Sequence, residues 1–376
     1  MSLRPRWRAA FLLAVLLIAG AAAYKPLAGL IFAGRLLLAV RALASGSIGH
    51  SLPVQESKIR RRLGDRELTA LLYRPTGSLP KSAVMVVPGI SELGCYHPRL
   101  RALARTLADE GFLVLTPDIE MFRRFEVARE ALEEFNFWFS QMQGLEGSED
   151  VQRSGIIGIS FSGTMALIAA ASPELRATFV MAIGPYQDLF RCARGWFAAG
   201  PVTAGEGYYP TRFYGKWILM RAALNMIDSK EEQQFLRDVL ISLLLQRPVP
   251  APSAALSPQA RRWYQLAVMP ENQTDAELSA AIEKRLAPWY RELSPDEAAA
   301  QIRCPVFLAH GAHDDLIPPV ESLELHKRIR HATSYLLISP FLTHTHPLET
   351  SLTWREKRIA VWQMLAFFYH LARTAR

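Results

Sequence analysis

A serine in a glycine-rich turn is the residue of this chain best placed for nucleophilic chemistry. Residues 155–164 read GIIGISFSGT, so an apolar run ends at Ser160 and is followed by two small residues, Ser162 and Gly163, and by an apolar helical pattern. A serine between a strand and a helix is held in a strained conformation that projects its hydroxyl, and its neighbours must be small. The pattern is G-x-S-x-S-G, with Ser162 where a second glycine is usual. Such a serine can also cap the following helix, so Ser160 is predicted to be a nucleophile with capping as the alternative.

The loops after the last two predicted strands carry a carboxylate and a base that could activate this serine. A serine hydroxyl is a weak nucleophile and needs an imidazole, itself oriented by a carboxylate. Asp314, in HGAHDDLIP, is the candidate acid, with Asp315 as the alternative. Aspartates also form turns without any catalytic role. His344, in FLTHTHP, is the candidate base because it comes first after the strand, and His346 is the alternative.

Two backbone amides are predicted to stabilise the negative charge that develops during attack. The N–H of Phe161 opens the helix after Ser160, and the N–H of Ile90 follows the sharp turn at residues 88–90. The pair His344 and His346 could also bind a metal ion, but no cysteine lies nearby and the other histidines are scattered. We therefore predict neither a metal nor a cofactor. His310 and His313 are predicted to shape the acid loop.

The pattern of apolar runs predicts the elements that position these residues. Short apolar strands alternate with helices of ordinary length, which is typical of a parallel sheet in an α/β protein. Between residues 185 and 300 the alternation stops, and this stretch is predicted to be a helical insertion that folds over the carboxyl ends of the strands, with helices at 231–245 and 275–290. The sequence predicts a β-hairpin at 54–74, strands at 82–89, 112–119, 155–159, 177–184, 306–310 and 334–340, and helices at 97–111, 125–145, 320–329 and 353–372.

The positive charge of the chain is concentrated at its amino-terminal end. The net charge is +8, and residues 1–66 contain eleven Lys or Arg against two acidic residues. Because this excess lies beside a hydrophobic stretch, it favours contact with anionic lipid and argues against a nucleic-acid partner. Three cysteines (Cys95, Cys192 and Cys304) lack zinc-ligand spacing and are predicted to pack in the core, with a single disulfide left open.

The amino-terminal stretch itself is predicted to contact a membrane. Residues 9–24 are uncharged and apolar and are preceded by three arginines. They predict an uncleaved anchor, with a cleaved signal peptide or a hairpin of two spans as alternatives. Residues 27–40 predict a second helix, lying along the membrane or packing on the domain. The arginines would remain in the cytoplasm, so a single-pass anchor places the catalytic part on the non-cytoplasmic side, and cleavage would give a secreted or periplasmic protein.

The motifs together resemble those of the α/β-hydrolase superfamily. The resemblance rests on GISFSG, on HGAHDDLIP, on a late histidine and on the order Ser, Asp, His, and it covers residues 54–372 apart from the insertion. It implies an eight-stranded, mostly parallel sheet with helices on both faces and a helical cap between the sixth and seventh strands. The implied domains are an amino-terminal segment at 1–50, a core at 54–185 and 301–376, and a cap at 186–300. Pro88 departs from the family, which often has histidine before the oxyanion glycine.

The function implied by this resemblance is hydrolysis through an acyl-enzyme. We expect a carboxylesterase- or lipase-like serine hydrolase that cleaves an ester, thioester or amide bond of a small-molecule or lipid substrate with an apolar acyl group. Serine at the turn argues against dehalogenases, which use aspartate, and against dienelactone hydrolases, which use cysteine. A catalytically silent protein of the same fold that binds a lipid or a protein at the membrane is the alternative, and acyl transfer to an alcohol would use the same acyl-enzyme.

Overall fold

A single large β-sheet forms the centre of the molecule. The computed structural model describes residues 26–38, 54–77, 79–198, 202–203, 208–209, 213–269, 273–314, 316–342 and 352–376. Its eight-stranded sheet has the order β1-β2-β4-β3-β5-β6-β9-β10, with β1, β2 and β4 paired antiparallel and all other neighbours parallel. The predicted eight-stranded, mostly parallel sheet is confirmed. Its strands are β1 (Gln55–Leu63), β2 (Arg66–Arg74), β3 (Ser82–Val87), β4 (Phe112–Asp118), β5 (Arg153–Ile159), β6 (Phe179–Ile183), β9 (Val306–Gly311) and β10 (Ser334–Ser339).

The central strands are apolar at nearly every position because both faces of the sheet are covered. In β3, Ala83, Met85 and Val87 belong to one hydrophobic core, while Val84 and Val86 belong to the other. The predicted hairpin is also present, since Leu63 pairs with Arg66 around a turn in which Gly64 has a φ of 59°. This left-handed conformation favours glycine.

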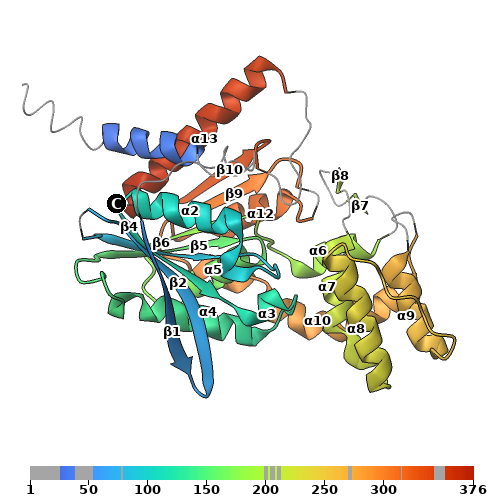
Figure 1. The fold of residues 1–376 in the computed structure, drawn as a ribbon. Helices are drawn as coiled ribbons and strands as arrows, with labels where there is room; N and C mark the ends of the chain where they lie inside the picture. The colour runs from blue at the N-terminus through green and yellow to red at the C-terminus, as the bar shows by residue number, and fades with distance from the viewer. Residues whose placement is uncertain are drawn as a thin grey trace, which may run out of the picture.

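Helices cover the two faces of the sheet (Figure 1). One face packs against α2 (Pro98–Asp109), α13 (Trp354–Ala375) and a helix formed by residues 26–38. The other face packs against α3 (Glu120–Arg123), α4 (Arg129–Gln141), α5 (Phe161–Ala170), α11 (Asp296–Gln301) and α12 (Val320–Arg328). Short 3₁₀ turns, η1 (Gly94–Tyr96), η2 (Met142–Gly144) and η3 (Leu224–Met226), connect several of these elements.

The described residues between β6 and β9 are mainly helical and gather on one side of the sheet (Figure 1). They form α6 (Leu189–Phe197), α7 (Phe213–Ala222), α8 (Lys230–Leu244), α9 (Pro258–Val268) and α10 (Ala276–Leu293), with a two-stranded ribbon of β7 (Val202–Thr203) and β8 (Tyr208–Tyr209). We call helices α6 to α10 the cap helices. Cys95, Cys192 and Cys304 are all unpaired thiols, so the disulfide left open by the sequence is not formed.

The amino-terminal helix packs on the domain. Phe32 is 1% exposed and its ring centroid lies 6.1 Å from that of Phe112. Arg35 donates to the Glu110 carboxylate at 2.9 Å. Gly29 faces α13 so closely that an added Cβ would lie 2.9 Å from the Tyr369 ring. Of the two arrangements predicted for this helix, packing on the domain is the one observed.

The predicted membrane location is wrong. In the described part of the chain, no helix has both the length and the apolar character needed to cross a bilayer. Residues 9–24, which were predicted as the anchor, lie outside the described residues. On the neighbouring helix, Phe32 and Leu36 are buried against the protein itself, whereas Leu27, Leu30, Ile31 and Leu38 are exposed. The assignment of a single-pass anchor, or of a secreted form after its cleavage, is therefore not retained.

Candidate active site

The turn between β5 and α5 holds Ser160 in a strained conformation. Its φ is 59° and its ψ is −126°, values that a non-glycine residue rarely adopts. The turn is fixed by backbone hydrogen bonds, in which the Ser160 N–H donates to the Ile183 carbonyl at 2.6 Å and the Gly163 N–H donates to the Ser160 carbonyl at 2.8 Å. The Ser160 side chain makes no capping hydrogen bond to α5. The geometry is therefore that expected of a nucleophile turn and differs from that of a serine cap.

Small residues allow the strand and the helix to approach each other at this turn. A Cβ added to Gly158 would collide with the Ser162 carbonyl oxygen, and one added to Gly163 would lie 3.4 Å from the Ala182 Cβ. Ser162 is fully buried, and its hydroxyl donates to the Pro88 carbonyl. Ser162 thus ties the turn to the loop after β3, a role that its small size alone did not reveal.

The two predicted oxyanion donors belong to segments that meet beside Ser160. Phe161 begins α5, and the first amides of a helix have no acceptor within the helix. Gly89 lies so near the turn that an added Cβ would be 3.4 Å from the Ser160 Cβ. The following residue, Ile90, lines the same cavity as Ser160 and Phe161. The oxyanion roles of Phe161 and Ile90 remain predictions, and their positions are compatible with these roles.

Asp314 is buried in the loop after β9 and is held by backbone amides. Its side chain is 3% exposed, and its Oδ1 accepts from the N–H groups of Leu316 at 3.0 Å and Ile317 at 2.9 Å. Leu316 and Ile317 also line the cavity that contains Ser160. The loop that orients Asp314 therefore forms a wall of that cavity. Asp315, the alternative acid, lies outside the described residues.

His310 stabilises this acid loop, as the sequence predicted. Its ring is fully buried, with Nδ1 2.7 Å from the Ser322 hydroxyl and Nε2 2.8 Å from the Ile317 carbonyl. Nε2 also lies 3.4 Å from Asp314 Oδ2. His313, in contrast, is exposed to solvent. His310 thus fixes the loop that carries Asp314, because both of its ring nitrogens contact residues of that loop or of α12.

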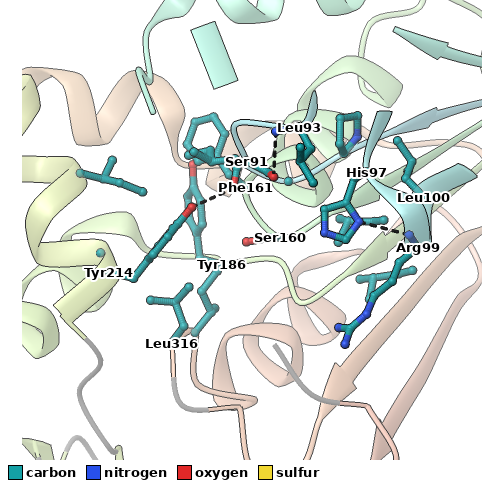
Figure 2. A pocket seen from close by; sticks show the side chains of 18 of the residues that line it. Ser91, Leu93, His97, Arg99, Leu100, Ser160, Phe161, Tyr186, Tyr214 and Leu316 are labelled. Carbon is teal, nitrogen blue, oxygen red and sulfur yellow. Dashed lines mark hydrogen bonds between the residues drawn. The ribbon is translucent and has the colours of Figure 1, made fainter. Parts of the chain in front are cut away.

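The predicted bases His344 and His346 lie outside the described residues, so their roles stay predictions. A described histidine, His97, lines the cavity with Ser160 (Figure 2). Its Nδ1 accepts from the Arg99 N–H at 3.2 Å and caps α2. Burial, with a smaller contribution from Arg99, lowers the pKa of His97. This placement was not predictable from the sequence, because His97 precedes Pro98 and the pair is typical of an ordinary helix start.

One cavity of about 630 Å³ surrounds Ser160. Figure 2 shows the Ser160 hydroxyl between Tyr186 and Tyr214 on one side and His97 and Leu100 on the other. Burial raises the pKa of the Tyr186 and Tyr214 hydroxyls, which therefore stay protonated and act as hydrogen-bond donors at neutral pH. The Tyr186 hydroxyl donates to the Leu293 carbonyl at 3.0 Å.

The cap helices are tied to both loops of the site. Trp196, on α6, donates from Nε1 to the Leu316 carbonyl at 2.8 Å. Tyr214, on α7, donates from its hydroxyl to the Ile90 carbonyl at 2.8 Å. One cap aromatic therefore holds the loop of Asp314, and another holds the loop that carries Ile90, the predicted oxyanion donor. The sequence predicted a helical insertion but could not identify these two contacts, which join residues more than a hundred positions apart.

A buried carboxylate fixes the start of the cap. Glu321, on α12, is completely buried and accepts from the backbone N–H groups of Gln187 at 2.8 Å and Asp188 at 2.9 Å. Its other oxygen accepts from Arg191 Nε at 2.6 Å. The segment that leaves β6 and enters α6 is thus bound to the core that also supports His310, since Ser322 follows Glu321 on α12.

A family comparison matches slightly more than half of the chain, including its Ser160 and Asp314 segments. The family model described as X-Pro dipeptidyl-peptidase (S15 family) matches residues 146–346. The matched segment includes the Ser160 turn, the cap helices and the Asp314 loop. No curated protein sequence matches the chain significantly.

Several solved structures of hydrolases superpose on this chain. Acylaminoacyl peptidase from Pyrococcus horikoshii superposes with a TM-score of 0.51 and 15% identity, over 86% of this chain and 41% of that one. Est1E from Butyrivibrio proteoclasticus gives a TM-score of 0.49 and 12% identity over 84% of this chain and 98% of that one. Puromycin hydrolase gives a TM-score of 0.48 and 15% identity over 86% of this chain and 40% of that one. The chain spans about two fifths of the length of the acylaminoacyl peptidase, and at this identity the likeness shows the fold.

Proposed function

Because the chain belongs to the X-Pro dipeptidyl-peptidase (S15) family, within the α/β-hydrolase superfamily, we propose that it is a serine hydrolase that uses Ser160 to form an acyl-enzyme. The observation that carries the proposal is the strained backbone of Ser160, with φ 59° and ψ −126°, at the wall of a mainly apolar cavity. Strain of this kind is retained where function requires it. The proposed bond is an ester, thioester or amide.

The proposed reaction has two steps. The Ser160 hydroxyl attacks the substrate carbonyl while His344, or in its place His346, takes the proton and Asp314 orients that imidazole. The N–H groups of Phe161 and Ile90 stabilise the oxyanion, and loss of one such donor typically costs about 10²- to 10³-fold in rate. The imidazole then gives its proton to the leaving group, and water, activated by the same base, releases the acid and restores the serine.

The lining of the cavity favours an apolar acyl group. A dipeptidyl-peptidase must bind the free ammonium group of its substrate, for which a carboxylate in the pocket is the natural partner. Among the described residues that line this cavity, the one acidic side chain is Glu92. Its carboxylate is 45% exposed and is paired with Arg247 at 3.1 Å. We therefore propose an uncharged, apolar acyl group in place of a dipeptide with a free amino terminus.

Labelling with a fluorophosphonate tests the nucleophile. The wild-type protein and Ser91→Ala, which alters another serine of the same cavity, should both be labelled, whereas Ser160→Ala should not. Labelling that persists in Ser160→Ala would mean that a residue other than Ser160 is the nucleophile. Absence of labelling in the wild type would favour a catalytically silent protein that binds an apolar ligand.

Hydrolysis of p-nitrophenyl acetate by His344→Ala and by His346→Ala identifies the base. The base is the histidine whose replacement reduces kcat by several orders of magnitude.

The competing substrate class is tested in the same assay. Hydrolysis of p-nitrophenyl esters should exceed that of a dipeptide p-nitroanilide with proline in the second position, such as Gly-Pro-p-nitroanilide. A clear preference for the dipeptide p-nitroanilide would contradict the proposed apolar substrate and favour X-Pro dipeptidyl-peptidase activity.

A further inference from the structure

The cavity extends from Ser160 in two directions. One arm lies beneath the cap helices, where Tyr214, Ile218 and Leu244 line it. The other arm, which we call the sheet-side arm, runs between the strands β5, β6 and β9 and the helices α2 and α13. Its walls are formed by Leu100, Leu103, Leu107, Ile157, Met181 and Phe368. The proposed triad and oxyanion donors make no use of this second arm.

The sheet register gives the direction and depth of the sheet-side arm. Ile157 pairs with Met181, and Ile159 pairs with Ile183, which in turn pairs with Ala309. All five residues line the cavity, so two successive rungs on one face of the sheet form its floor. Residues two apart on a strand share a face, and the path from Ser160 back to Ile157 spans about 10 Å of strand. The arm therefore leads away from the catalytic edge and into the layer between sheet and helices.

An open space in this layer needs a physical explanation. Apart from the half-buried Leu103, its walls are almost fully buried, with Leu107 2%, Phe368 3% and Met181 4% exposed. Protein interiors are close-packed, and empty apolar space forfeits dispersion contacts and costs stability. Other parts of the same layer are filled tightly, as shown by the Phe307 and Tyr335 rings, whose centroids lie 4.7 Å apart. A cavity kept open beside a reactive serine is best explained by a ligand that fills it.

The two arms differ in their access to solvent. The cap-side lining includes the exposed residues Glu92, Leu93 and Gln246. A leaving group must depart and water must enter while the acyl group is still bonded to Ser160, so they require an open route. The sheet-side arm ends among the buried residues Leu36, Phe368 and Leu371. An arm that ends among buried apolar side chains suits the part of the substrate that stays bonded to the serine.

We infer that the sheet-side arm binds an unbranched hydrocarbon chain on the acyl side of the substrate, so that the preferred substrates are esters of straight-chain fatty acids. This inference rests on the proposed hydrolase function. It assigns to Leu103 and its neighbours the selection of the acyl chain and leaves the cap-side arm to the leaving group.

A series of p-nitrophenyl esters from acetate to decanoate tests the inference. Each buried methylene should raise kcat/KM by up to about fourfold until the arm is filled. Leu103→Trp narrows the arm from the side of α2, where Leu103 is only half-buried, and should reduce the decanoate-to-acetate ratio of kcat/KM at least tenfold. Leu132→Trp is the matched control, because Leu132 is an equally half-buried leucine on α4, against the other core. It should leave the ratio as in the wild type.

The outcomes separate this inference from the proposed function. Labelling of Ser160 together with a flat dependence on chain length in the wild type would overturn the inference and leave the hydrolase in place. Chain selectivity that Leu103→Trp does not change, while Leu245→Trp in the cap-side arm abolishes it, would move the acyl chain beneath the cap and also overturn it. If Leu103→Trp does not fold, Leu103→Phe serves in its place.

Binding to the unreactive variant provides a readout independent of catalysis. Dodecanoate should bind Ser160→Ala in isothermal titration calorimetry, and Leu103→Trp in that background should weaken binding at least tenfold. If dodecanoate binds Ser160→Ala but no fluorophosphonate labels the wild-type protein, the result would support the sheet-side arm and refute the hydrolase function. Absence of dodecanoate binding to Ser160→Ala would count against the arm.

Discussion

At the scale of single residues, Ser162 departs from the usual pattern of the serine turn, and the structure gives this departure a physical meaning. Ser162 is completely buried, and its backbone carbonyl lies against Gly158, where an added Cβ would collide with it. Its hydroxyl also donates to the Pro88 carbonyl, two residues before the predicted oxyanion donor Ile90. Ser162 therefore couples the strained turn at Ser160 to the loop that carries Ile90.

We predict that Ser162→Ala reduces kcat for p-nitrophenyl acetate about tenfold, less than the 10²- to 10³-fold typical of losing an oxyanion donor outright. The Pro88 carbonyl would lose a buried partner, which costs about 1–3 kcal/mol of stability. Thr164→Val is the control, because it removes a buried hydroxyl of the same helix that bonds to the Tyr186 backbone. An equal loss of kcat in both variants would show that Ser162 has no specific link to the oxyanion loop.

Single residues also mark the limit of what the sequence could predict about the site. The strained turn at Ser160 and the acid loop at Asp314 were predictable, because each follows an apolar strand within a recognisable motif. The positions of His97 beside the cavity and of Tyr214 against the Ile90 carbonyl were not. These contacts depend on how separate elements pack, and no local pattern encodes that packing. His344 and His346 remain predictions from the motif alone.

At the scale of elements, the strands were predicted well and the helix ends less well. Buried parallel strands are continuous apolar runs bounded by loops, so β3, β4 and β5 begin and end close to the expected positions. The helix expected from residue 125 begins instead at Arg129, because Phe125 has a φ of 56°, which a helix cannot accommodate. In the cap, α10 continues through Pro288 to Leu293, held by the buried ring of Tyr290.

The contact between α6 and the acid loop leads to a prediction for these elements. Trp196 donates to the Leu316 carbonyl, and the Leu316 N–H holds Asp314. Trp196→Phe keeps most of the ring but removes this donor, so the loop should loosen and kcat for p-nitrophenyl acetate should fall about tenfold. Trp217→Phe is the control, since Trp217 donates to the Ala267 carbonyl within the cap at 2.9 Å. A larger loss of kcat in Trp217→Phe than in Trp196→Phe would contradict the proposed role.

At the scale of the whole molecule, the basic amino-terminal region is tied into the fold by ion pairs. Arg35 bonds to Glu110, and Arg66 bonds to Glu134 at 2.6 Å. Glu110 also accepts from Arg376 at 2.7 Å, so one carboxylate joins the amino-terminal helix to the carboxyl terminus. Charge counted along the sequence indicated a lipid surface, but part of that charge is matched by acids brought close only by folding.

The helix at residues 26–38 is expected to contribute to global stability. Phe32 packs against Phe112, and the Arg376 guanidinium lies 4.7 Å from the centre of its ring. We predict that Phe32→Ala lowers the free energy of unfolding by about 3 kcal/mol, at the lower end of the usual cost for a buried phenylalanine because the helix lies at the edge of the core. Ile31→Ala, at a neighbouring position that is 51% exposed, should change it by less than about 0.5 kcal/mol. Guanidinium denaturation measures the free energy of unfolding of both variants. Equal values for Phe32→Ala and Ile31→Ala would mean that packing of Phe32 on the core does not stabilise the protein.

Leu36 of the same helix lines the sheet-side arm. A variant that loosens this helix, such as Phe32→Ala, should therefore reduce decanoate hydrolysis more than acetate hydrolysis.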